Sequence, residues 1–177
     1  QTMRIVELLE QRYPGFPGLN LTYEVREGLV KHDTDYDVTD ATGFEPDKAG
    51  TLEAQIANLA DEIAYNTADL DDGLRSGILE PAEVAALPLW QMARQALAMA
   101  PDYAVPADAP LDSLLRARLI RKLIAAEVTD AISATARRLE RCSVQSVGDV
   151  RDQGENIAGF SADMREYNRE LKAFLLQ

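Results

Sequence analysis

The stretch LEAQIANLADEIAYNTADLDDGL, residues 52–74, decides the fold class. Each residue of an α-helix advances about 100° around the axis, so apolar residues three or four apart share one side. The apolar residues on that side are Leu52, Ile56, Leu59, Ile63 and Leu70. Thr51 precedes them and is a residue type that caps helix N-termini. We therefore predict an amphipathic helix over about residues 51–72.

The opposite face of this predicted helix carries polar groups. Asp61, Tyr65 and Asp69 are spaced i, i+4, i+8 and fall on nearly one line, flanked by Asn58 and Asp72. Carboxylates suit hard divalent metals and sugar hydroxyls, and a tyrosine hydroxyl can donate to a phosphate oxygen. A polar face opposite an apolar stripe is most often simply solvated. The spacing alone leaves both interpretations open.

The rest of the chain also follows the helical period, and alternating strand patterns are scarce. We predict an all-α protein, a single helical domain over residues 1–177. The predicted helices cover residues 2–13 (with Ile5, Val6, Leu8 and Leu9 inward), 20–32 (capped by Asn20), 82–99, 111–140, and the C-terminus from a cap at Ser161 or Asp163. Pro88 is expected to kink the 82–99 helix or to mark its true start. Residues 33–50 and 143–159 are expected to be irregular, the latter with one short turn. Because the chain starts with Gln1 and its last helix has no stop signal, we expect a fragment truncated at both ends.

Composition excludes several classes of function. Lys and Arg number 18 against 30 Asp and Glu, a formal net charge of −12, so no broad nucleic-acid surface is expected. No apolar run approaches the roughly 20 residues of a membrane span. One cysteine, Cys142, cannot form an internal disulfide, which fits a reducing cytosol. One histidine, His32, cannot by itself supply a site that needs several histidine ligands.

Other short patterns carry weaker signals. His32-Asp33 is an HD dipeptide, but it falls at a predicted helix end, where a histidine is favoured by the helix dipole. The stretches 33–37 and 69–73 imitate the start of a calcium loop, with the required glycine absent or misplaced. The long helix carries a basic cluster that could face phosphates or an allosteric nucleotide, or could simply be solvated or salt-bridged. This cluster is Arg116, Arg118, Arg121 and Lys122, and we assign it no role.

Residues 52–74 closely resemble a signature of the HD-domain deoxynucleoside triphosphate triphosphohydrolases, the bacterial dGTPase-like family. Residues 4–6, 9–14, 18–32 and 170–175 resemble the same family in the same order, whereas the match at 80–110 is poor. The resemblance implies that the chain is a multi-helix part of an HD-domain fold.

The resemblance also implies a reaction, the metal-assisted hydrolysis of a dNTP at its α-phosphorus. The products are a deoxynucleoside and inorganic triphosphate, and the metal is expected to be Mg²⁺ or Mn²⁺. Asp61 matches the family's last metal ligand, and Tyr65 matches a tyrosine at the substrate sugar and phosphates. Asp69 matches the aspartate that accepts from the sugar 3′-hydroxyl, and Lys31 matches a lysine that reaches the triphosphate.

The chain departs from the family pattern in one large respect. The family's metal-binding histidine, its His-Asp pair and its acid/base residues all precede the point that matches Gln1. We therefore expect no catalytic residue within this chain and no activity of the chain alone. For the parent protein the resemblance implies a cytoplasmic homo-oligomer that binds dNTPs, with no membrane partner. The alternative is a non-catalytic acidic interaction module or a regulatory nucleotide-binding module, and an upstream His and His-Asp pair in the gene would favour the enzyme.

Overall fold

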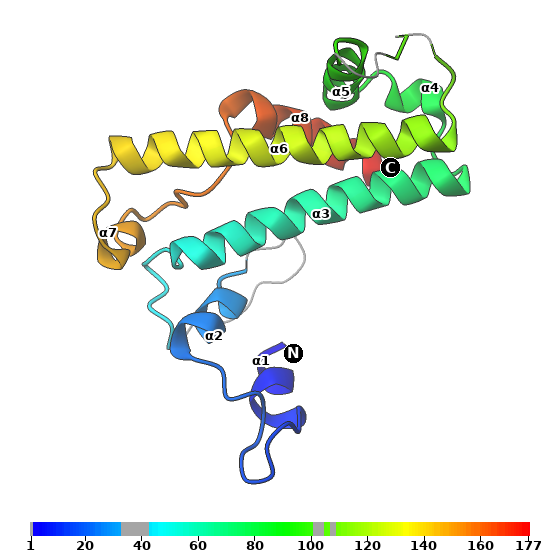
Figure 1. The fold of residues 1–177 in the computed structure, drawn as a ribbon. Coiled ribbons are helices and arrows are strands. Elements are labelled where there is room, and N and C mark those ends of the chain that lie inside the picture. The colour runs from blue at the N-terminus through cyan, green and yellow to red at the C-terminus, as the bar shows by residue number, and fades with distance from the viewer. Residues whose placement is uncertain (1, 33–42, 101–104, 107–108) are drawn as a thin grey trace. The chain divides into compact units, whose positions relative to one another are not determined.

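A computed structural model describes residues 2–32, 43–100, 105–106 and 109–177, and this part of the chain is predominantly helical (Figure 1). Its elements are α1 (Thr2–Arg4), the π-helix η1 (Ile5–Leu9), α2 (Tyr23–Val30), α3 (Leu52–Ser76), α4 (Pro81–Val84), α5 (Pro88–Ala98), α6 (Ser113–Arg141), α7 (Val147–Arg151) and α8 (Ala162–Leu175). The described residues contain no strand, only isolated bridges at a turn near residues 11–18. The all-α prediction is confirmed.

The described residues divide into two compact units. Unit 1 comprises Gln1–Leu59 and Arg137–Gly159, and unit 2 comprises Ala60–Ala136 and Phe160–Gln177. Helices α3 and α6 each contribute residues to both units. The single domain over residues 1–177 stays a prediction. None of the helices in the described ranges combines the length and apolar character that a membrane span requires.

Unit 1 is organised around buried polar residues. The side chain of Gln55, buried at the start of α3, donates from Nε2 to the carbonyl of Gly50 at 2.8 Å. Its Oε1 accepts from the backbone N–H groups of Ile157 and Ala158, at 2.7 and 3.0 Å. One amide thus satisfies backbone groups from segments about a hundred residues apart in the sequence. The half-buried thiol of Cys142 lies just beyond the end of α6 in this unit.

Helix α2 begins later than predicted. Thr22 is its N-cap and accepts from the backbone N–H of Val25 at 3.4 Å. Asn20, the expected cap, has a φ of 53° in the left-handed region and lies outside the helix. Further along α2, Gly28 approaches Ala54 so closely that a Cβ on the glycine would lie 3.1 Å from the Ala54 Cβ. The glycine therefore allows α2 to pack tightly against the start of α3.

Unit 2 has the apolar core. Its buried residues are Ile63 and Leu70 of α3, Val84 of α4, Leu89, Trp90, Ala93 and Leu97 of α5, Leu115, Leu119, Leu123, Ala131 and Ala134 of α6, Phe160, and Met164 and Leu171 of α8. Helix α5 packs against α8. Within this unit α3 and α6 lie side by side (Figure 1), and an ion pair of 2.8 Å joins Asp71 to Arg116.

Two predictions about apolar faces are wrong. Ile56 lies on the predicted apolar stripe of α3, yet its side chain is 49% exposed. Ile5, Leu8 and Leu9 were expected inward and are exposed. Their helix is also shorter than the predicted 2–13, because the returning chain takes its backbone groups: the N–H of Leu19 donates to the Val6 carbonyl at 2.8 Å and that of Gly18 to the Glu10 carbonyl at 2.9 Å.

The other boundaries follow local signals in the sequence. Pro88 is the first residue of α5, so it marks a true helix start and not a kink. Ser161 caps α8 by accepting from the backbone N–H of Met164 at 3.3 Å. Residues 143–159 contain one short helix, α7, as expected. Its N-terminus is a capping box formed by Ser146 and Asp149.

Candidate functional site

Helix α3 presents the predicted polar row to the surface of unit 2. Asp61, Tyr65 and Asp69 are all exposed, and the Tyr65 side chain is 60% exposed. The opposite side of the same helix, with Ile63 and Leu70, is buried. An α-helix rises about 1.5 Å per residue, so Asp61 and Asp69 stand about 12 Å apart along the axis with Tyr65 midway. The predicted shared face of these three residues is confirmed.

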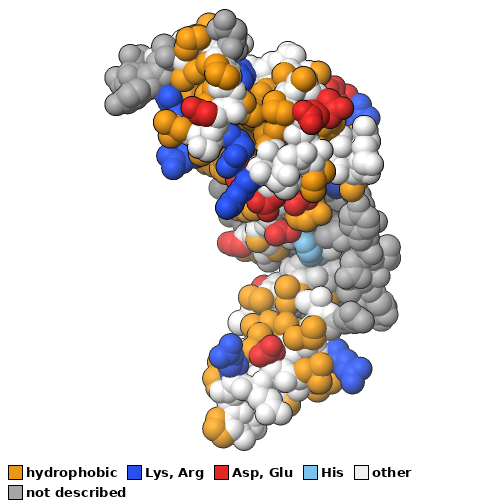
Figure 2. Space-filling view, turned by 90° about the vertical axis from the view of Figure 1, so that its right-hand side faces the viewer, with side chains coloured by type: hydrophobic (Ala, Val, Ile, Leu, Met, Phe, Trp, Pro, Cys, Tyr) orange, Lys and Arg blue, Asp and Glu red, His pale blue; other side chains and the backbone are white. Residues whose placement is uncertain are grey.

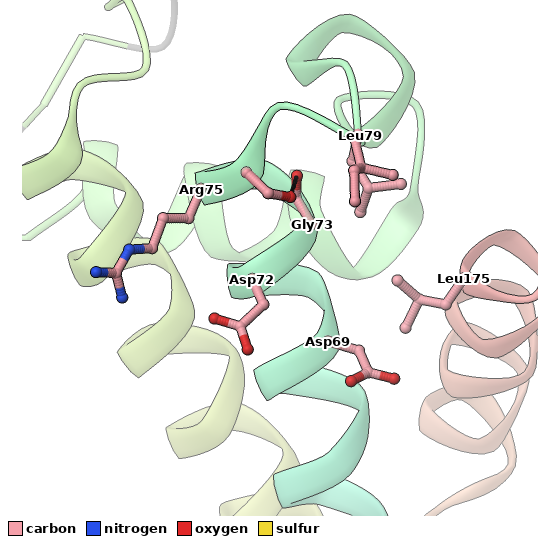
Figure 3. A pocket seen from close by; sticks show the side chains of 8 residues that line it. Asp69, Asp72, Gly73, Arg75, Leu79 and Leu175 are labelled. Carbon is pink, nitrogen blue, oxygen red and sulfur yellow. Dashed lines mark hydrogen bonds between the residues drawn. The ribbon is translucent and has the colours of Figure 1, made fainter.

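A hollow of about 570 Å³ lies at the C-terminal end of this row (Figure 3). Asp69 lies at its edge, and Leu79 from the α3–α4 connection and Leu175 from α8 reach toward it, while the guanidinium of Arg75 points away from Leu175. The other lining residues are Asp72, Gly73, Ser76 and Ile78. A Cβ on Gly73 would lie 2.5 Å from Cδ1 of Leu79, so the glycine leaves room for the present position of this leucine. The hollow thus combines an apolar wall with a carboxylate edge.

Lys31 lies in unit 1, where its ammonium group is fully engaged. Nζ donates to Oε1 of Glu27 at 2.8 Å and to the carbonyls of Glu45 and Lys48 at 3.0 and 2.7 Å. An ammonium group has three N–H donors, and these three bonds use them all. Lys31 therefore ties the segment 45–48 to helix α2.

The weaker sequence patterns have ordinary structural surroundings. His32 Nδ1 lies 2.8 Å from Oδ1 of Asn58, at the C-terminal end of α2. Its neighbour Asp33 and the calcium-like stretch 33–37 lie outside the described residues. The second calcium-like stretch, 69–73, is part of α3, and its Asp71 is paired with Arg116. A continuous helix does not provide the loop that a calcium site of that type needs.

The comparisons with known proteins bear on this site. No protein-family model matches the chain. It is similar to the deoxyguanosinetriphosphate triphosphohydrolase-like protein of Geobacter sulfurreducens, with 42% identity over 178 residues, 99% of this chain and 44% of the relative. The protein of the same name from Deinococcus deserti is 40% identical over 179 residues, 99% of this chain and 42% of the relative. Over nearly its whole length the chain is thus similar to dGTPase-like proteins. It spans less than half the length of these relatives.

The similarity to dGTPase-like proteins raises the question of a metal site within the chain. Structural and catalytic metal centres use three or more protein ligands, or a bound phosphate in their place. Searched over the described ranges, the chain has no group of three or more His, Cys, Asp or Glu side chains placed to hold a metal ion. The Asp61 carboxylate is a suitable oxygen ligand, but the described residues of this chain do not by themselves form a metal centre.

The basic cluster on α6 includes an ion-paired residue. Arg116 is paired with Asp71, which favours the salt-bridge interpretation for that residue. Arg121 and Lys122 are exposed. On the face drawn in Figure 2, the described Lys and Arg side chains are scattered among acidic and apolar ones. Among the described residues, that face of the chain offers no continuous basic surface.

One residue of interest was missed by the sequence analysis. Glu127 continues the inward row Leu115, Leu119, Leu123 at the same spacing of four, and its side chain is 0% exposed. Burial raises the pKa of its carboxyl to about 7. The signal was present in the sequence, because helical phase places this charged residue on the apolar side of the 111–140 helix.

Proposed function

We propose that this chain is the part of a dNTP triphosphohydrolase that holds the substrate with the exposed face of α3. The reaction converts dGTP and water to deoxyguanosine and inorganic triphosphate. The observation that carries the proposal is the shared surface row of Asp61, Tyr65 and Asp69. Relatives named deoxyguanosinetriphosphate triphosphohydrolase-like support it.

Each residue of the row has a role that suits its chemistry. Asp61 would supply one carboxylate ligand to a divalent ion, Mg²⁺ or Mn²⁺, in the whole protein. Such an ion, when bound, offsets negative charge on the phosphates. Tyr65 donates from its hydroxyl to the sugar or phosphate oxygens, and the Asp69 carboxylate accepts from the sugar 3′-hydroxyl. The axial separation of about 12 Å between the two aspartates leaves room for a sugar and a phosphate between them.

Lys31 would contact the substrate only if its present hydrogen bonds change. To contact a triphosphate it must exchange one of its present acceptors for a phosphate oxygen. The backbone carbonyls of Glu45 and Lys48 are the acceptors most readily exchanged, because they carry no full charge. Lys31 would then both order the 45–48 segment and sense the substrate.

The test compares the full-length parent protein with the 177-residue chain. Triphosphate release from dGTP and the other dNTPs is measured with Mn²⁺ and with Mg²⁺. We expect turnover in the parent and none in the chain alone. No dNTP binding or turnover by a folded, metal-loaded parent would contradict the proposal.

Variants of the parent assign the individual roles. Asp61→Asn should abolish turnover, and Asp69→Asn should lower kcat/KM roughly 10- to 100-fold by removing a charge-assisted hydrogen bond. The matched control is Glu53→Gln, an exposed acid on the same helix but outside the row. Circular dichroism checks that all variants remain folded. If Glu53→Gln lowers turnover as much as Asp61→Asn does, the row of Asp61, Tyr65 and Asp69 has no special role.

A non-catalytic interaction module is the second candidate. Helix α6 carries exposed apolar side chains at Ile124, Val128 and Ile132, spaced i, i+4, i+8. Such a row is typical of a helix face that contacts another protein. If the parent binds no dNTP, this surface becomes the better starting point.

A further inference from the structure

The core of unit 2 contains polar residues on three of its helices. Glu127 of α6, Asn66 of α3 and Asn168 of α8 are all at most 2% exposed. They lie on the inward faces of their helices, between apolar residues such as Ile63, Leu123 and Leu171. Burying polar groups in an apolar core is costly unless they are hydrogen-bonded. These three side chains therefore call for an explanation.

Their hydrogen-bonding groups do not balance. Within the described part of the chain, both carboxyl oxygens of Glu127, Oδ1 of Asn168 and Nδ2 of Asn66 have no hydrogen-bond partner. The amide of Asn168 donates to the carbonyl of Met164 at 3.2 Å. Glu127 and Asn168, which lie close to each other, thus hold three unpartnered acceptor atoms and no unpartnered donor atom. One added proton on Glu127 supplies a donor to this set of acceptors.

On balance, the surroundings of Glu127 favour its neutral form. Burial is the largest influence on its carboxyl and disfavours the charged form. From α8, the Asn168 amide is close enough to favour the charged form, without a normal hydrogen bond to either oxygen. From α3, the carboxylate of Glu62 repels a second negative charge. On α6 itself, Asp130 accepts from the backbone N–H of Ser161 at 2.8 Å.

We propose that Glu127 is a buried proton-binding site that couples the packing of unit 2 to pH. Its neutral form holds α8 against α6, and its ionisation, which releases the proton to solvent, loosens that packing. The device is reversible and needs no reactant other than a proton. It does not depend on the proposed hydrolase activity.

The sign of the pH dependence follows from the two states. An unfolded Glu127 loses its proton near pH 4.5, whereas the folded one keeps it until about pH 7. Between these values the folded state binds the extra proton, so stability falls as pH rises and levels off above about 7. A difference of about 2.5 pKa units corresponds to a roughly 300-fold loss in the folding equilibrium constant across this range.

The test uses the whole 177-residue chain and its single tryptophan, Trp90, which is buried in α5, a helix that packs against α8. Urea unfolding is followed by Trp90 fluorescence from pH 5 to 8.5. Glu127→Gln mimics the neutral acid, so it should remove most of the pH-dependent loss and exceed the native chain in stability at pH 8.5. The matched control, Glu83→Gln, changes an exposed acid in the same unit and should keep the native pH dependence.

A second measurement does not depend on how the variant folds. In the native chain labelled with ¹³C at glutamate carboxyls, one carbon should titrate near pH 7. The proposal is overturned if every glutamate carbon titrates below pH 6. It is also overturned if Glu127→Gln and the native chain lose stability in parallel as pH rises.

Discussion

Glu27 is a single buried carboxylate that organises much of unit 1. Its side chain is 1% exposed, and its Oε1 accepts from Lys31 Nζ at 2.8 Å and from Arg151 Nη2 at 2.6 Å. Arg151 also contacts Glu45 at 2.8 Å. A buried charge of this kind is tolerated because both cations reach it. The residue therefore connects α2, the segment near residue 45 and α7.

Replacing Glu27 should be strongly destabilising. Glu27→Ala leaves two cations without their shared buried partner, and we expect a loss of about 3 kcal/mol in the free energy of unfolding. Urea unfolding followed by circular dichroism measures it. Glu24→Ala, an exposed acid on the same helix, is the control and should have a much smaller effect. Similar effects of the two substitutions would show that the paired geometry matters little.

At the scale of elements, a helix boundary could be predicted from the sequence where residues at that boundary determine it. Pro88 and Ser161 start helices through their own backbone and side chain. The sequence predicted helices here, but it left open whether Pro88 starts or kinks one and whether Ser161 or Asp163 caps the other. The failure near the N-terminus has a distant cause, the return of Gly18 and Leu19 to backbone groups of η1 and Glu10. No period in the sequence carries that information.

The cap of α8 offers a prediction for one element. Ser161→Ala removes the oxygen that accepts from Met164 N–H and should lower the free energy of unfolding by about 1 kcal/mol. Thermal unfolding of the chain measures the change. Ser133→Ala, at an exposed interior position of α6, serves for comparison and should be close to neutral. A neutral result for Ser161→Ala would mean that water replaces the cap without cost.

At the scale of the whole molecule, the candidate site was only partly predictable. The common face of Asp61, Tyr65 and Asp69 follows from helical phase, so the sequence sufficed. The bonds of Lys31 to Glu45 and Lys48 arise when a segment 14 or 17 residues away folds back, which no local pattern encodes. The roles of these four residues stay predictions until activity is measured.

The fold of the described residues should not need a metal. These residues place no three candidate ligands together, so we expect no metal ion to link them. Adding excess EDTA should leave the helical circular dichroism signal and the Tm of the 177-residue chain unchanged. A Tm that falls by several degrees with EDTA and recovers with Mn²⁺ would contradict this expectation.

Trp90 and Cys142 offer a natural donor and attachment site for a fluorescence energy-transfer measurement. The chain contains one tryptophan and one cysteine, and these fall in unit 2 and unit 1 respectively. A thiol-reactive acceptor dye on Cys142 would make Trp90 an energy-transfer donor without any mutation. The transfer efficiency would then report directly on motion between the two units when nucleotide, metal or protons are added.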